Sequence, residues 1–121
     1  MNATLTGISP VLVVADIDRA AAYYRDQLGF HCRVWGQPPH LVTADRDEVL
    51  ILLVLGERPE KSDRMFDVHV RVDDVEALHA EMQESGAQID YPIYDGEHGF
   101  RDFGVLDPDG HRLAFGQPMH G

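Results

Sequence analysis

The first half of the chain carries short apolar runs separated by polar, turn-forming clusters. The run at 8–14 is rich in β-branched residues and stops at Ala15, which predicts a strand. Apolar residues then recur at helical spacing up to Gly29, and Asp16 or Asp18 can cap the helix that they predict. Three further strands are expected at 30–35, 41–44 and 49–55.

The same order of patterns returns in the second half. Val68, Val70 and Val72 alternate with polar residues, as in a half-buried strand. A helix capped by Asp73 or Asp74 is expected next, ending at Gly86. The remaining strands are expected at 88–91, 100–106 and 111–116, the last two joined by the turn Asp107-Pro108-Asp109-Gly110.

The two halves also match each other position by position. Residues 11–18 align with residues 69–76, an offset of 58 (69 − 11), and the glycines that end the two helices lie 57 apart (86 − 29). A repeat of this length that occurs twice indicates duplication of one unit. We therefore expect a single domain over 1–121, with module one at about 6–56, a linker at about 57–64 and module two at about 65–117.

The motifs of the second half resemble those of a known family. They are Val72-Asp73-Asp74-Val75 before a helix ending at Gly86-Ala87, then Arg101-Asp102-Phe103, then Asp107-Pro108-Asp109-Gly110-His111-Arg112-Leu113. In this order they resemble the second module of the vicinal oxygen chelate (glyoxalase/bleomycin-resistance/dioxygenase) superfamily, and the resemblance covers about residues 6–117. It implies an α+β fold in which two βαβββ modules form a curled mixed sheet around a cavity, usually in a homodimer.

The resemblance also implies four positions for metal ligands, which fall here on Ser9, Leu52, Asp67 and Ala114. Leucine and alanine offer no lone pair, and serine is a poor ligand for a transition metal. We therefore expect the protein to hold no metal ion and no cofactor. Metal-dependent chemistry would need a relocated site, for which the candidates are Asp67 and His69 together with Glu97 or His98.

Alternation along the strand around Val70 indicates which side chains face the expected cavity. If the valines pack against a helix, then Asp67, His69 and Arg71 lie on the opposite, cavity-facing side. Pairing Leu106 with His111 across the turn would place Phe103 opposite Ala114 and Arg101 near Gly116, on that same side. With Trp35 and Tyr94 as aromatic walls, the expected ligand-binding residues are Trp35, Asp67, His69, Arg71, Tyr94, Arg101 and Phe103.

Composition and charge narrow the classes of partner. Twenty-one acidic and ten basic side chains give a net charge of −11, which opposes binding to nucleic acid or to an anionic membrane. No apolar run approaches the ~18 residues needed to span a bilayer, and no signal peptide is evident, so a cytoplasmic location is expected. Cys32 has no second cysteine to pair with, and we expect it to pack within a strand.

These observations favour a binding protein over an enzyme. The chain carries no Gly-x-Ser-x-Gly motif and no phosphate-binding glycine loop, and no catalytic residue is assigned. The leading hypothesis is a metal-free homodimer that sequesters a small aromatic or cationic compound such as an antibiotic. The alternatives are a glyoxalase-like lyase or dioxygenase with a relocated metal, and a non-catalytic accessory domain.

Overall fold

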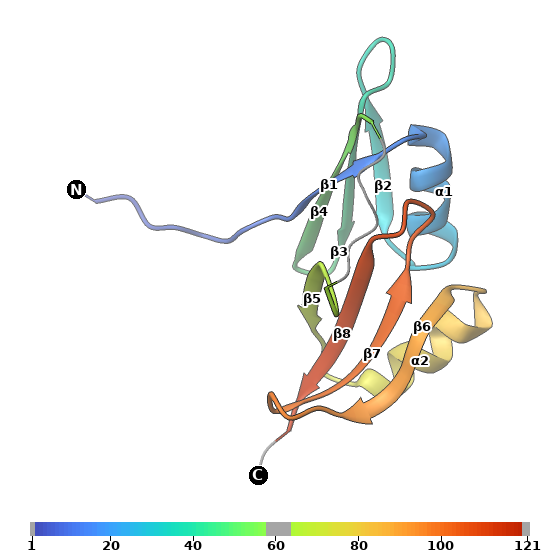
Figure 1. Cartoon of the computed structure of the whole chain (residues 1–121). Helices are drawn as coiled ribbons and strands as arrows, with labels where there is room; N and C mark the ends of the chain where they lie inside the picture. Colours follow the sequence, from blue (N-terminus) through green and yellow to red (C-terminus); the bar gives the residue numbers. More distant parts are fainter. Residues whose placement is uncertain (1, 58–63, 120–121) are drawn as a thin grey trace.

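The computed structural model describes residues 2–57 and 64–119, and within them the strands form two separate four-stranded sheets (Figure 1). The first sheet has the order β1-β4-β3-β2 and the second the order β5-β8-β7-β6. The first module comprises β1 (Val11–Val14), α1 (Ile17–Asp26), β2 (His31–Trp35), β3 (Leu41–Arg46) and β4 (Val49–Leu55). The second comprises β5 (Val68–Arg71), α2 (Val75–Glu84), β6 (Gln88–Asp95), β7 (Phe100–Leu106) and β8 (Arg112–Pro118).

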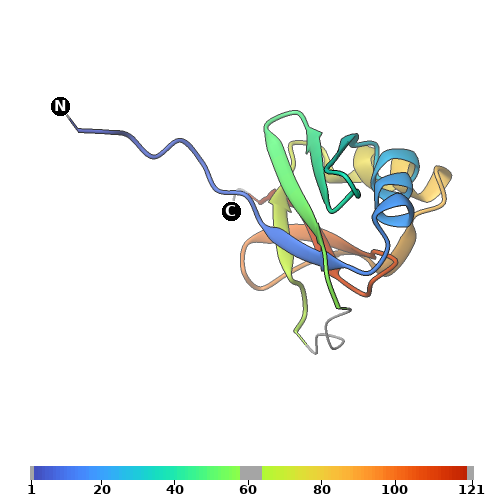
Figure 2. The ribbon, with the colours of Figure 1, turned by 90° about the horizontal axis from the view of Figure 1, so that it is seen from above.

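Both modules follow the same path, which confirms the predicted α+β class and the βαβββ repeat. In each, the first strand pairs in parallel with the last, while the other neighbours are antiparallel. Each helix covers one face of its own sheet, and the two mixed sheets do not close on each other (Figure 2). Most of the expected linker at 57–64 lies outside the described residues.

The helices begin and end where capping chemistry predicts. Of the two candidate caps in each module, the structure uses Asp16 and Asp74, whose carboxylates accept from Arg19 N and Ala77 N, both at 3.0 Å. After each helix the chain turns through a glycine with positive φ, +78° at Gly29 and +87° at Gly86, a conformation that costs a side-chain-bearing residue steric strain. No helix among the described residues is long and apolar enough to cross a membrane.

The apolar core lies between each helix and its sheet. In the first module it includes Tyr24 of α1, Val42 of β3 and Leu53 of β4, all fully buried. Cys32 is half-buried against this core, and desolvation raises the pKa of its thiol to about 11. The thiol therefore stays protonated near neutral pH and contributes packing, as expected.

Strand bounds differ from the predicted ones at two places. The first strand begins at Val11 rather than Ile8, because Pro10 has no N–H and joins the sheet only through its carbonyl, which accepts from Leu52 N at 3.0 Å. The residues before it extend away from the body (Figure 2), and Ile8 is exposed. β6 runs on to Asp95, four residues beyond the predicted end, with irregular pairing to β7 on both sides of Tyr91.

The pairing of β7 with β8 is offset by one residue from the predicted register. Asp107 N donates to His111 O at 3.0 Å, so the connection spans five residues instead of four. Leu106 therefore pairs with Arg112 rather than with His111. As a one-residue slip exchanges the two faces of a strand, this correction moves Arg101 and Phe103 to the α2 side of the sheet and Asp102 to the other side.

The turn between β7 and β8 packs against α1 and joins the two modules (Figure 1). Asp107 is buried and accepts from the Tyr24 hydroxyl at 2.8 Å and from the backbone N–H groups of Asp109 and His111. Desolvation raises the pKa of the Asp107 carboxyl above its usual value, while these donors oppose the shift. Burial, reinforced by the Asp107 charge, likewise raises the pKa of Tyr24, which keeps the hydroxyl a donor.

Tyr24→Phe removes one donor from this buried carboxylate and should lower the free energy of unfolding by about 1–3 kcal/mol, because a buried acceptor loses its partner. Urea unfolding monitored by circular dichroism measures the change. Arg25→Ala is the control: Arg25 is exposed and forms an ion pair with its exposed neighbour Asp26, so a change within about 0.5 kcal/mol is expected. Equal effects of the two substitutions would contradict the structural role given to Tyr24.

Candidate functional site

The face of the second sheet opposite α2 presents polar and small side chains. Val68 and Val70 of β5 are buried toward the helix, so His69 between them lies on the opposite face, as alternation predicts. His69 pairs with Ala114 of β8, and Asp102 of β7 pairs with Gly116. We call this side of the sheet the open face.

Three polar side chains from different elements meet on the open face. His69 comes from β5, Asp102 from β7 and His98 from the connection between β6 and β7. The Asp102 Oδ2 atom lies 3.0 Å from His98 Nε2 and 3.3 Å from His69 Nε2. We refer to these residues as the His–Asp cluster.

The backbone at Gly116 makes room for this cluster. A Cβ atom there would overlap Asp102 Oδ1 and would lie 2.9 Å from His69 Nε2. Asp102 is fully buried, whereas the side chains of His69 and His98 are 19% and 36% exposed. The carboxylate is thus shielded from solvent, whereas both imidazoles are partly accessible, His98 more than His69.

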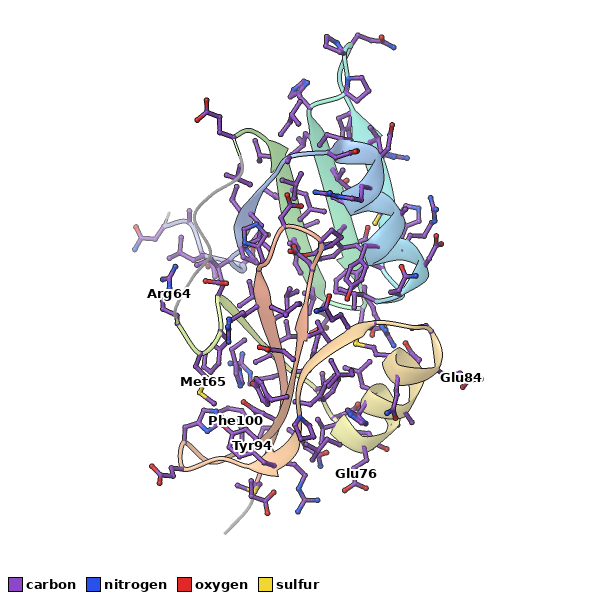
Figure 3. All side chains as sticks on the ribbon, turned by 45° about the vertical axis from the view of Figure 1, so that its right-hand side comes forward. Arg64, Met65, Glu76, Glu84, Tyr94 and Phe100 are labelled. Carbon is purple, nitrogen blue, oxygen red and sulfur yellow. The ribbon has the colours of Figure 1, made fainter. Side chains whose placement is uncertain are left out.

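Apolar side chains surround the His–Asp cluster. The Phe100 ring centroid lies 4.7 Å from that of His69 and 5.3 Å from that of His98, and Phe66 lies 5.2 Å from His69. Tyr94 pairs with Asp102 across the ladder, and its hydroxyl is 3.9 Å from the Met65 sulfur; Figure 3 labels Met65, Tyr94 and Phe100 in the same region of the second module. Met65, Phe66, Tyr94 and Phe100 together form what we call the apolar rim.

Tyr91 lies under this rim, with its ring over Gly104 and edge-on to Tyr94 at 5.6 Å. Its hydroxyl is buried and has no hydrogen-bond partner among the described residues. Desolvation, followed by the nearby Asp102 charge, raises the pKa of this phenol well above its usual value. Tyr91 is therefore a neutral wall of the site rather than a base.

Asp67 precedes β5 but does not join the His–Asp cluster. Its Oδ2 accepts from Arg112 N at 2.9 Å, and its Oδ1 lies 3.4 Å from Arg64 Nη2. Glu97 is exposed, and within the described ranges the group of possible metal ligands consists of His69, His98 and Asp102. Of the ligands considered for a relocated site, the structure brings together the two histidines and supplies Asp102 as the carboxylate.

Arg101 and Phe103 lie on the α2 side of the sheet, away from the cluster. Phe103 is fully buried, stacks on Phe115 at 5.5 Å and contacts the His79 ring of α2 at 4.9 Å. Arg101 donates to Asp95 at 2.7 Å and to Glu76 of α2 at 3.0 Å. The five-residue connection before β8 explains why both residues leave the face on which they were expected.

Trp35 and Arg71 are exposed but differently placed. Trp35 lies on β2, the edge strand of the first sheet, where its indole N–H donates to Thr43 Oγ1 at 2.9 Å and Arg33 lies over its ring. It therefore belongs to a different sheet from the His–Asp cluster. Arg71 ends β5 two residues beyond His69 and remains on the open face.

Two of the four ligand positions implied by the family resemblance carry side chains that cannot coordinate a metal. Leu52 pairs with Val11 in the first sheet and Ala114 pairs with His69 in the second. Neither side chain carries a donor atom. Ser9 precedes β1, and Asp67 Oδ2 accepts a hydrogen bond from Arg112 N.

Sequence reasoning did not include Asp102, Phe66 or Phe100 in the site. Asp102 was hidden by the register error, since it alternates with Phe103 along β7. The sequence signal for Asp102 is Gly116, which lies directly opposite it on β8. A glycine within a strand leaves space for a side chain from the neighbouring strand to approach the backbone closely. Phe66 lies outside a strand, and nothing in the periodicity marks it.

Comparison with known proteins supports the family expected from the motifs. The family model of the Glyoxalase/Bleomycin resistance protein/Dioxygenase superfamily matches residues 7–115. A comparison with curated protein sequences gives no match.

Solved structures similar to this chain have low sequence identity. A bleomycin-binding protein from Streptomyces verticillus, in complex with copper(II)-bleomycin, has 23% identity and a TM-score of 0.78, with 99% of each chain covered. A glyoxalase-related enzyme from Clostridium phytofermentans has 20% identity and a TM-score of 0.82, with 97% of this chain and 98% of that chain covered. These similarities establish the fold, and the family match extends over most of the sequence. The chain belongs to the Glyoxalase/Bleomycin resistance protein/Dioxygenase superfamily.

Proposed function

We propose that this protein binds and sequesters a small aromatic, cationic molecule, such as an antibiotic, on the open face of the second sheet. The observation that carries the proposal is the combination of the apolar rim with the fully buried Asp102 carboxylate beneath it. Aromatic faces and a desolvated carboxylate both attract cations. A site of apolar walls with a few convergent polar groups is typical of small-molecule binding.

The placement of the arginines supports a cationic rather than an anionic ligand. Arg101 is paired with Asp95 and Glu76 on the other side of the sheet. Of the two arginines expected at the site, Arg71 therefore remains on the open face, where it would favour an anionic ligand. The net charge of −11 adds a diffuse attraction for cations. That attraction is screened within about 10 Å at 0.1 M salt, so contacts within the site determine most of the preference.

Structural neighbours support a binding role at the level of the fold. Two of them are described as bleomycin-binding proteins, and a third is a bleomycin resistance determinant encoded on the transposon Tn5. Leu52 and Ala114, at two of the ligand positions implied by the family resemblance, carry no donor atom, which argues against metal-dependent turnover at those positions. A metal-dependent lyase or dioxygenase is the second candidate, and it rests on the His–Asp cluster alone.

We also propose that the protein acts as a homodimer in the cytoplasm. The face of the first sheet away from α1 presents Val11, Trp35 and Leu50 at 58%, 44% and 38% exposure. Leu52 and Val54, on that same face, are only half-buried. A contiguous apolar sheet face of this kind is typical of a protein interface.

Cationic aromatic compounds should bind more tightly than anionic analogues of equal size, because a cation over an aromatic face gains roughly 0.5–2 kcal/mol. The measurement is calorimetric titration of EDTA-treated protein at two salt concentrations. Phe100→Ala should weaken binding of the cation, and His40→Ala, an exposed change in the first module, is the control that should leave it unchanged. Tighter binding of the anion, lost in Arg71→Ala, would reject the cationic ligand and favour acidic compounds.

Sedimentation at micromolar concentration should show a species of twice the 13.6 kDa chain mass. Val11→Asp should shift the protein toward the monomer, because it introduces a charge into the apolar face of the first sheet. Glu84→Ala, an exposed change on α2, should leave the mass unchanged. A wild-type protein that sediments only as a single chain would exclude the dimer.

A further inference from the structure

We propose that the His–Asp cluster is a binding site for one divalent transition-metal ion, distinct from the four ligand positions implied by the family resemblance. One ligand atom from each of His69, His98 and Asp102 lies within 4.8 Å of the others. The proposal goes beyond small-molecule sequestration, since it concerns an ion and depends on the cluster's own geometry.

The separations within the cluster suit coordination to a common ion. Zinc binds imidazole nitrogen and carboxylate oxygen at about 2.0–2.2 Å, and a tetrahedral arrangement then separates neighbouring ligand atoms by about 3.3–3.5 Å. The observed separations from Asp102 Oδ2 are 3.0 Å to His98 Nε2 and 3.3 Å to His69 Nε2. The separation between the two histidine nitrogens is within 4.8 Å, so rotation of the imidazole rings would bring the three groups onto a common ion.

The donor set selects the type of ion. Two imidazole nitrogens with one carboxylate suit zinc, nickel, cobalt or iron, whereas magnesium and calcium prefer oxygen ligands alone. Three protein ligands leave at least one position for water or for a group from a bound molecule. His98 is the most exposed of the three ligands, so an ion can first meet the cluster at its imidazole.

The burial of Asp102 provides an independent reason for a cation at this place. Its carboxylate is fully buried, and within the described residues its side-chain contacts are with the two imidazoles. A buried carboxylate is expensive unless it is paired with a cation or coordinates a metal. Gly116 across the ladder leaves the space that the group occupies.

The rings around the cluster hold the imidazoles in place. Phe100 contacts both histidine rings edge-on, at 4.7 Å and 5.3 Å, and Phe66 is stacked on His98 at 6.4 Å. Ligands that are already oriented lose little side-chain entropy when the ion binds. This arrangement distinguishes the cluster from exposed histidines such as His40.

Metal binding can be tested without any organic ligand. EDTA-stripped protein is titrated with Zn²⁺ by calorimetry and with Co²⁺ by visible absorption, and one ion per chain is expected. His98→Ala should weaken binding at least about tenfold, since second-shell losses alone already cost 10–100-fold. His40→Ala is the control, because His40 is exposed in the first module and its ring contacts the Pro38 carbonyl. Circular dichroism confirms that each variant is folded.

Two results would overturn the metal site. One is wild-type protein that binds no ion at micromolar concentrations. The other is equal binding by His98→Ala and His40→Ala, which would indicate adventitious binding to surface histidines. Asp102→Asn should also lose the ion, but it alters a buried group, so the solvent-accessible His98 decides the test. Failure of metal binding leaves the small-molecule proposal standing, because that proposal is tested on EDTA-treated protein.

Discussion

The buried Asp107 carboxylate and its bond from Tyr24 are the interaction on which the arrangement of the two modules depends. Asp107 begins the connection between β7 and β8, and Tyr24 projects from α1 of the other module. The next acidic residue, Asp109, accepts from Ala15 N at 2.9 Å and lies 3.4 Å from Arg19 Nη2. The turn therefore provides acceptors for its own backbone N–H groups and at the same time attaches the second sheet to the helix of the first module.

The same turn also determines which side chains lie on the open face, because it sets the register between β7 and β8. The Asp107 carboxylate accepts hydrogen bonds from the backbone N–H groups of Asp109 and His111, which stabilises a five-residue connection between β7 and β8. This connection sets the register in which Asp102 lies opposite Gly116. At the other end of α1, Arg46 bonds to Leu28 O and to Glu81 of α2, which joins the modules a second time. The carboxylate of the His–Asp cluster thus owes its position to the hydrogen bonds of a turn that begins five residues after it (107 − 102).

The elements of the fold were largely predictable because their signals are local. Caps at Asp16 and Asp74 and the glycines after each helix follow from backbone chemistry. The composition of the site was less predictable, because it depends on a register that one residue in a turn decides. His69 was placed on the correct face by alternation along β5, while Arg101 and Phe103 were assigned to that face from a turn one residue too short.

Charge links the two proposals for the open face. Without an ion, the Asp102 carboxylate gives the site a negative charge, and a cationic aromatic ligand is favoured. With a divalent ion, the charges of the ion and of Asp102 sum to +1, which favours a ligand that offers a lone pair or a negative group. Arg71 on the same face adds to the second preference. If both proposals hold, the ligand preference of the open face depends on whether the His–Asp cluster holds an ion.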